Sequence, residues 1–135
     1  GKVVKHLSSN NLNPHINIEY LGSVSNDKLI DLYSNAQMLV FPSFYEGFGL
    51  PPLEAMSCSC PTIISNIPVL KELYKSSSIY INPYSVEDIK NMILKLLNDD
   101  ELRNNLVKSG LSESRNYSWK KSASEIIDLI KDILK

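Results

Sequence analysis

The sequence of 135 residues lacks most of the features that would indicate a membrane or a nucleic-acid partner. No apolar run approaches the ~20 residues that a membrane-spanning helix requires. The 14 lysines and arginines are balanced by 15 aspartates and glutamates, and no basic stripe of the kind that binds nucleic acid is present. Because 43% of the residues are hydrophobic and 21% charged, the composition is that of a globular domain rather than a disordered chain. We therefore expect a cytoplasmic protein with no nucleic-acid partner.

Cysteine is also scarce, since the chain contains only Cys58 and Cys60. A single intervening residue makes a disulfide between them difficult. No further cysteine completes a zinc set, and His6 and His15 lie far away in the sequence. We expect two buried, reduced thiols, as in a cytosolic protein.

Short apolar runs alternate with helical patterns along the chain. A helix from 26 to 34 and one from 86 to 97 each begin after a capping serine, and Gly110 is a plausible helix stop. Alternating strands and helices predict an α/β fold: a Rossmann-like parallel sheet with helices on both faces. The expected strands are 16–21, 38–41, 62–64 and 79–81, and the expected helices are 26–34, 51 onward, 69–75, 86–97, 99–110 and 118 onward.

Four strands are few for a doubly wound sheet, so we expect the domain to be truncated at its N-terminus. The run 38–41 is apolar throughout, which is typical of a strand covered on both faces, and we take it as the central strand. Apolar residues also line one face of the last helix. We expect this face either to be part of the core or to pack against an absent domain. These residues are Ile126, Ile127, Ile130, Ile133 and Leu134.

The candidate site is the segment from Phe44 to Ala55, FYEGFGLPPLEA, which follows this central strand. In parallel sheets, ligands bind at the carboxyl ends of the strands. Gly47 and Gly49 allow close approach of a ligand to the backbone, and proline suits the first turn of a helix beginning near Pro51. A helix start after a glycine loop is a phosphate-binding arrangement.

Two carboxylates flank the glycines. Glu46 lies in the loop and Glu54 on the first helical turn, so both can border one pocket whose floor is Gly47 to Leu50. Carboxylates accept hydrogen bonds from paired hydroxyls, which makes sugars natural partners. A purely structural interpretation stays open, because the helix dipole alone favours a glutamate in a first turn and Gly and Pro alone mark turns.

The segment resembles the signature of retaining glycosyltransferases of the GT-B fold, family 4. The resemblance rests on Pro42-Ser43, on Glu46-Gly47-Phe48-Gly49-Leu50-Pro51 and on Glu54-Ala55, together with Tyr20-Leu21-Gly22 upstream and Cys60-Pro61-Thr62 downstream. It extends over nearly the whole chain from about Ile16. It implies that residues 1–135 form a single, partial nucleotide-sugar-binding domain, the C-terminal half of a two-domain enzyme.

The resemblance also implies roles for individual residues. Glu46 would orient the donor sugar, the backbone of Gly47, Phe48, Gly49 and Leu50 would contact sugar and diphosphate, and Glu54 would bind the ribose. The loop from Gly22 to Val24 would lie near the nucleobase. The donor would be a UDP- or GDP-linked hexose and the acceptor a glycan or a lipid-linked acceptor. No metal or other cofactor is expected, because backbone amides, the helix dipole and basic residues assist the leaving phosphate.

The sequence departs from the family pattern in two ways, and each departure leads to an expectation about this chain. The acceptor-binding N-terminal domain is absent, as are two strands and an Arg–Lys pair that grip the diphosphate. We therefore expect the chain alone to be inactive, and any peripheral membrane association to depend on the absent domain. The family glycine before Pro61 is replaced within Cys58-Ser59-Cys60, so a left-handed residue in this turn would be strained by ~1 kcal/mol.

Two other function classes remain open from the residues alone. A pair of carboxylates can serve as acid and nucleophile in a glycoside hydrolase. A flavodoxin-like module without catalysis would share the fold and would tolerate substitution of Glu46 and Glu54.

Overall fold

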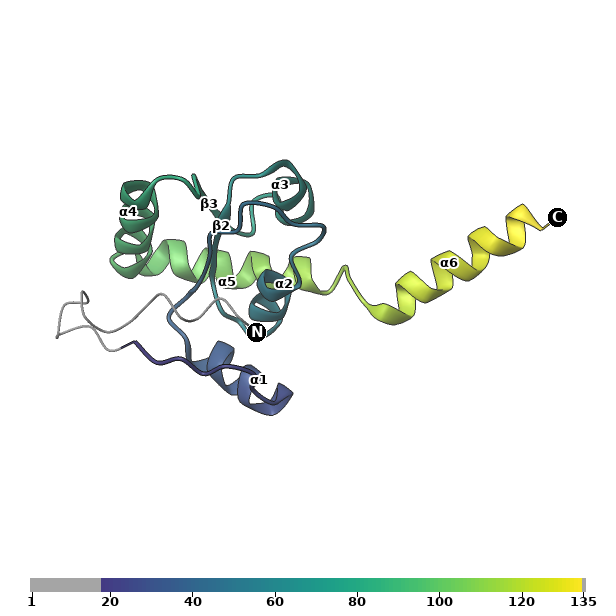
Figure 1. Cartoon of the computed structure of the whole chain (residues 1–135), viewed down its shortest axis with the longest axis horizontal. Helices are drawn as coiled ribbons and strands as arrows, with labels where there is room; N and C mark the ends of the chain where they lie inside the picture. Colours follow the sequence, from purple (N-terminus) through teal and green to yellow (C-terminus); the bar gives the residue numbers. More distant parts are fainter. Residues whose placement is uncertain (1–17, 135) are drawn as a thin grey trace.

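The computed structural model describes residues 18–134, which form an α/β body and a projecting C-terminal helix (Figure 1). Three strands, β1 (Leu39–Phe41), β2 (Thr62–Ser65) and β3 (Ile79–Ile81), form a parallel sheet in the order β1-β2-β3. Leu39 pairs with Thr62, and Ile63 with Ile79. This confirms the predicted Rossmann-like α/β class.

Six helices accompany the strands in the described part of the chain. Their bounds are α1 (Asn26–Asn35), α2 (Leu50–Ser57), α3 (Pro68–Tyr74), α4 (Val86–Leu97), α5 (Asp100–Ser114) and α6 (Trp119–Ile133). The predicted serine caps are confirmed at three of them: the hydroxyl oxygens of Ser25, Ser85 and Ser118 each accept a bond from a backbone N–H three residues later.

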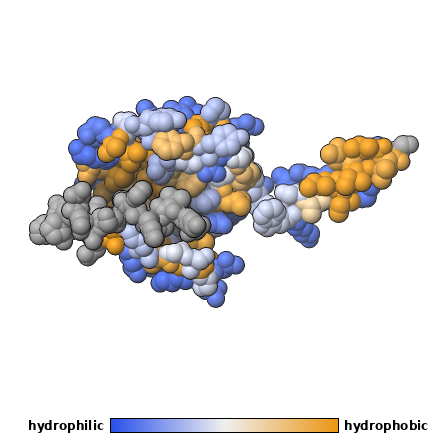
Figure 2. Space-filling view, in the orientation of Figure 1, coloured by the Kyte–Doolittle hydropathy of each residue, from blue (hydrophilic) through white to orange (hydrophobic). Residues whose placement is uncertain are grey.

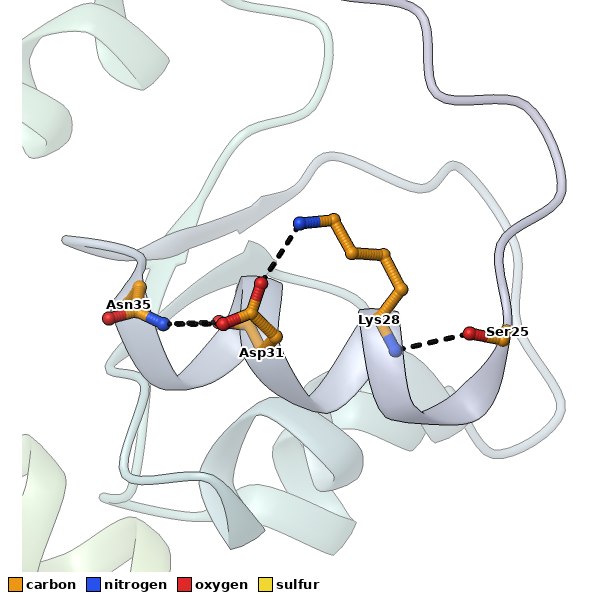
Figure 3. A network of polar contacts seen from close by, with 4 residues as sticks. All are labelled: Ser25, Lys28, Asp31 and Asn35. Atoms are coloured by element: carbon orange, nitrogen blue, oxygen red, sulfur yellow. Dashed lines mark hydrogen bonds and ion pairs between the residues drawn. The ribbon is translucent and has the colours of Figure 1, made fainter.

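Helix α1 carries a polar network on its outer face (Figure 3). The backbone N–H of Lys28 donates to the Ser25 hydroxyl, and the Lys28 ammonium lies 2.9 Å from the Asp31 carboxylate. The Asn35 amide donates to the same carboxylate at 3.0 Å. These groups are exposed, so the ion pair contributes little to stability.

Neighbouring residues of each strand point to opposite faces of the sheet, and each face has its own core. On one face, Ile64 packs with Met56 of α2 and with Leu70 and Tyr74 of α3. On the other face, Ile63 and Ile81 pack with residues of α4 and α5, among them Leu96 and Leu106. Helices therefore cover both faces, as the alternation of strands and helices predicts.

Two predictions about the strands are wrong. The part of the run 16–21 that the structure describes, from residue 18 onward, forms no strand, and none of the three described strands pairs with it. The run 38–41 is the half-buried edge of the described sheet, whereas β2 is the fully buried central strand. The apolar character of β1 therefore did not identify the centre.

Gly110 does not end its helix as predicted, since α5 continues to Ser114. It is buried against α2, where a Cβ would lie 3.0 Å from Met56 Cγ. The glycine therefore permits close packing of α5 on α2 rather than a turn.

The turn after α2 contains a left-handed residue that is not glycine, the geometry for which strain is expected. Ser59 has φ 63°, the left-handed conformation that glycine usually occupies. Cys58 is half-buried, whereas Cys60 is buried. Burial raises the pKa of Cys60 to about 11, so this thiol stays protonated, while Cys58 is less buried than predicted.

Helix α6 projects from the body and exposes its apolar face (Figures 1 and 2). Ile126 is 58% exposed and Ile133 is 73% exposed. These residues are therefore not part of either core in the described chain. Docking of this apolar face against another domain stays a prediction.

Candidate functional site

The candidate site is built on the loop that leaves the carboxyl end of β1 and enters α2. Its last residue, Gly49, is the N-cap of α2 and has a left-handed φ of 79°. A Cβ at this position would lie 2.8 Å from Leu70 Cδ2, and Leu70 is fully buried in the core. The fold itself therefore requires glycine at position 49.

Gly47 differs from Gly49 in each of these respects. It is exposed, its φ is not left-handed, and a Cβ would meet no atom within 4 Å. Neither backbone conformation nor packing within the described residues calls for glycine here. The space beside its backbone is open to solvent and to a ligand.

Helix α2 begins at Leu50, one residue before the predicted start, and continues through Pro51 and Pro52. The first amides of a helix have no partner within the helix, and proline has no N–H. The amides of Gly49 and Leu50 are therefore the N–H groups that this helix start offers to an anion, next to the positive end of the helix dipole.

Two tyrosines that the sequence analysis did not identify support this loop from behind. Tyr74, fully buried at the end of α3, donates its hydroxyl hydrogen to the Gly49 carbonyl at 2.6 Å. Tyr117 donates to the Leu73 carbonyl at 3.2 Å, and its ring meets the Phe48 ring edge-on, with centroids 5.3 Å apart. No spacing or motif places these side chains near the loop, since each lies more than twenty residues away.

Glu46 lies in the loop and is half-buried. The Ser43 hydroxyl lies 2.7 Å from Glu46 Oε1 and 2.9 Å from the Tyr45 carbonyl. A hydroxyl has one hydrogen to donate, so these two acceptors share it. The contact orients the Glu46 carboxylate and leaves most of its hydrogen-bonding capacity for another partner.

Glu54 lies on the second turn of α2, not on the first as predicted, because the helix starts at Leu50. It is exposed and borders a groove of about 260 Å³ between α1 and α2. Burial raises the pKa of Tyr33 in this groove, and the charge of Glu54 adds to the effect. The groove is lined by Asn26, Leu29, Ile30, Tyr33, Glu54, Ser57 and Cys58.

A second groove of about 260 Å³ lies on the other side of the helix start and is mostly apolar. It includes Phe48 and Leu50 of the candidate site together with residues at the start of α6. Its lining residues are Phe48, Leu50, Leu53, Tyr117, Ser118, Trp119 and Ser122.

The predicted site residues are thus only partly brought together. Gly47, Phe48, Gly49 and Leu50 lie together beside Glu46, with Gly49 buried beneath the others, whereas Glu54 faces the groove shared with α1. Gly22, with φ 60°, is exposed and Val24 is half-buried shortly before α1. Among residues 18–134, no hydrogen bond joins Gly22 or Val24 to either glutamate.

Within the same residues, no cluster of three or more His, Cys, Asp or Glu side chains is arranged to hold a metal ion. None of the described helices has the length and apolar character needed to cross a membrane.

Comparison with known proteins identifies the family. Residues 2–113 match the sequence model of the family described as Glycosyl transferases group 1. This chain belongs to that family. Its parallel sheet, covered by helices, is the C-terminal type of Rossmann-like unit found in GT-B glycosyltransferases.

Several curated relatives are mannosyltransferases by name. The chain is 40% identical over 114 residues to O-antigen chain mannosyltransferase B of Escherichia coli, covering 84% of this chain and 30% of that protein. It is also 40% identical over 109 residues to the serotype-specific mannosyltransferase WbdA of Escherichia coli, covering 81% of this chain and 13% of the relative. The chain thus spans less than a third of either relative.

A solved structure confirms the fold. The sucrose-phosphate synthase of Thermosynechococcus elongatus matches with a TM-score of 0.78 and 27% sequence identity, over 86% of this chain and 30% of the other. The match is to part of that enzyme, in agreement with the curated relatives.

Proposed function

We propose that this chain is the donor-binding part of a retaining, family 4 glycosyltransferase that transfers a hexose from a nucleotide-sugar to a glycan or a lipid-linked acceptor. One observation carries the proposal. Gly47 is a glycine that the fold does not need, with open space beside its backbone. It lies two residues before the N-cap of α2, a helix start whose free amides are those of Gly49 and Leu50. A ligand that approaches the backbone closely and carries negative charge explains both features.

In this proposal the amides of Gly49 and Leu50 and the dipole of α2 stabilise the charge that develops on the leaving diphosphate. Glu46, with its carboxylate oriented by Ser43, borders the donor sugar. Glu54 accepts hydrogen bonds from the ribose hydroxyls, and Gly22 to Val24 lie toward the base. No metal is required, because backbone dipoles supply the charge stabilisation.

The donor is a UDP- or GDP-linked hexose. Since the named relatives are mannosyltransferases, we propose a mannosyl donor. The relatives are about three times as long as this chain or longer, so we further propose that residues 1–135 are a partial domain. Transfer then needs a separate acceptor-binding domain, and the enzyme acts in the cytoplasm or at the inner face of the membrane. The alternatives of a glycoside hydrolase and a non-catalytic module find no support in the comparisons.

Calorimetric titration of UDP, GDP and their sugar conjugates into the protein tests the proposal. We expect saturable binding of one nucleotide. Glu54→Ala should weaken that binding by about 10–100-fold, the loss expected for a hydrogen bond to a charged group. Glu46→Ala should leave nucleotide affinity nearly unchanged and lower turnover in the complete enzyme.

Glu125→Ala is the matched control, because Glu125 is an exposed glutamate on α6, outside the site. Equal, small effects of Glu46→Ala and Glu54→Ala would contradict the assigned roles. A folded protein that binds none of these nucleotides would contradict the function itself.

A further inference from the structure

Tyr74 makes a contact that core packing alone does not explain. Its ring lies in the core with Met56, Ile64 and Leu70, and its exposed fraction is 0%. Its hydroxyl donates to the Gly49 carbonyl at 2.6 Å and lies 3.4 Å from the Phe48 carbonyl. A phenylalanine ring would fill the same space in the core. The tyrosine hydroxyl therefore contributes the hydrogen bond to the loop rather than core packing.

These two carbonyls belong to the two peptide groups that matter at the helix start. A peptide group is planar and trans, so its C=O and the following N–H point in opposite directions. The Phe48 carbonyl shares its plane with the Gly49 N–H, and the Gly49 carbonyl shares its plane with the Leu50 N–H. Because a hydroxyl has one hydrogen to donate, the 2.6 Å contact makes the Gly49 carbonyl its main acceptor, and holding this carbonyl toward the core turns the Leu50 N–H away from it. The Phe48 carbonyl, at 3.4 Å, is a weaker second acceptor, and the same orientation of its peptide group turns the Gly49 N–H away.

We propose that Tyr74 is a positioning residue for the donor diphosphate: it aims the amides of Gly49 and Leu50 outward by holding the carbonyls of Phe48 and Gly49 inward. The inference rests on the proposed function, in which these amides bind the diphosphate. Because prolines at 51 and 52 remove two of the amides that a helix start would otherwise present, the orientation of the remaining two has a large share in anion binding.

A second contact supports the same arrangement. The Phe48 side chain makes an edge-on contact with the Tyr117 ring. The Tyr117 hydroxyl in turn donates a hydrogen bond to the carbonyl of Leu73, the residue before Tyr74. The loop is thus fixed through both the backbone and the side chain of Phe48 to the end of α3.

The test compares Tyr74→Phe with Tyr80→Phe. Tyr80 packs against the same core cluster and donates its hydroxyl hydrogen to the Leu70 carbonyl of α3 at 3.3 Å, not to a carbonyl of the loop. Both substitutions remove one tyrosine hydroxyl bonded to a backbone carbonyl. Two quantities are measured for each: the amide proton chemical shifts of Gly49 and Leu50 in the free protein, which report the orientation of these peptide groups, and the calorimetric affinity for inorganic pyrophosphate and for the preferred nucleoside diphosphate.

We expect Tyr74→Phe to shift the amide proton resonances of Gly49 and Leu50 and to weaken binding by about 5–10-fold, the loss of roughly one hydrogen bond. Tyr80→Phe should change neither, although both variants should lower the melting temperature similarly. Unchanged affinity in Tyr74→Phe, or equal loss in both variants, would overturn the inference while leaving the proposed function intact. Absence of binding by the unsubstituted protein would overturn both.

Discussion

Gly47 and Gly49 lie two residues apart in one loop, yet the molecule uses them differently. Gly49 is buried and has a left-handed φ, and a Cβ at this position would clash with Leu70. Its carbonyl accepts a hydrogen bond from the Tyr74 hydroxyl. Gly47 is exposed, has no left-handed φ and has no neighbour within 4 Å of a Cβ. One end of the loop belongs to the core, and the other end faces open space.

The difference separates what the fold requires from what a ligand requires. A glycine whose Cβ would clash within the protein is explained by folding alone and says nothing about function. A glycine with open space beside it, at the carboxyl end of a parallel strand, needs another explanation. Gly47 is therefore the more informative of the two about activity.

Gly49→Ala should have the largest effect on stability. The left-handed φ costs about 1 kcal/mol for alanine, and the contact with buried Leu70 adds roughly 1–3 kcal/mol of overpacking. We expect a loss of about 2–4 kcal/mol in the free energy of unfolding, measured by urea denaturation.

A double-mutant cycle with Leu70→Ala checks the cause of that loss. If Leu70 is responsible, Gly49→Ala should cost clearly less in the Leu70→Ala background. Purely additive effects would show that the contact with Leu70 contributes nothing.

Ser59→Gly should have a smaller effect of the opposite sign. Ser59 is a non-glycine residue with a left-handed φ of 63° at the other end of α2. Its presence shows that such a φ can be tolerated, so the requirement at Gly49 must come largely from packing. We expect Ser59→Gly to stabilise the protein by about 0.5–1 kcal/mol in the same denaturation assay.

Ser112→Gly is the control for this substitution, since Ser112 is exposed within α5. It should destabilise by about 0.5–1 kcal/mol, because glycine is a poor helix former. If both substitutions destabilise, the left-handed conformation of Ser59 carries no strain.

Gly47→Ala should have the smallest effect on stability, within about 0.5 kcal/mol of the unsubstituted protein. The added methyl group meets no atom, and the φ needs no glycine. Urea denaturation of this variant beside Gly49→Ala measures the contrast directly. A loss of more than 1 kcal/mol would show that the fold does require Gly47.

Much of the fold could be predicted from the sequence, because its signals are local. Ser25, Ser85 and Ser118 begin helices by accepting backbone bonds three residues ahead, and the apolar periodicity locates α4 and α6. Non-local relations were not predictable. The edge position of β1 and the burial of Gly110 against Met56 depend on which elements meet in space.

The candidate site shows the same division. The glycine loop and the two glutamates are contiguous in the sequence, so a motif identifies them. Tyr74 reaches the loop only through the packing of α3 on α2, and Glu54 faces α1 because of the direction of its side chain on the helix. Neither contact could be predicted from the spacing of residues in the sequence.

The most direct test of the central claim is calorimetric titration of the preferred nucleoside diphosphate into the unsubstituted protein and into Gly47→Ala. The account predicts saturable binding to the former and at least about 10-fold weaker binding to the latter, because the methyl group occupies the space that the ligand needs. Equal affinity of the unsubstituted protein and of Gly47→Ala, with equal stability, would contradict the claim that a bound ligand requires glycine at position 47.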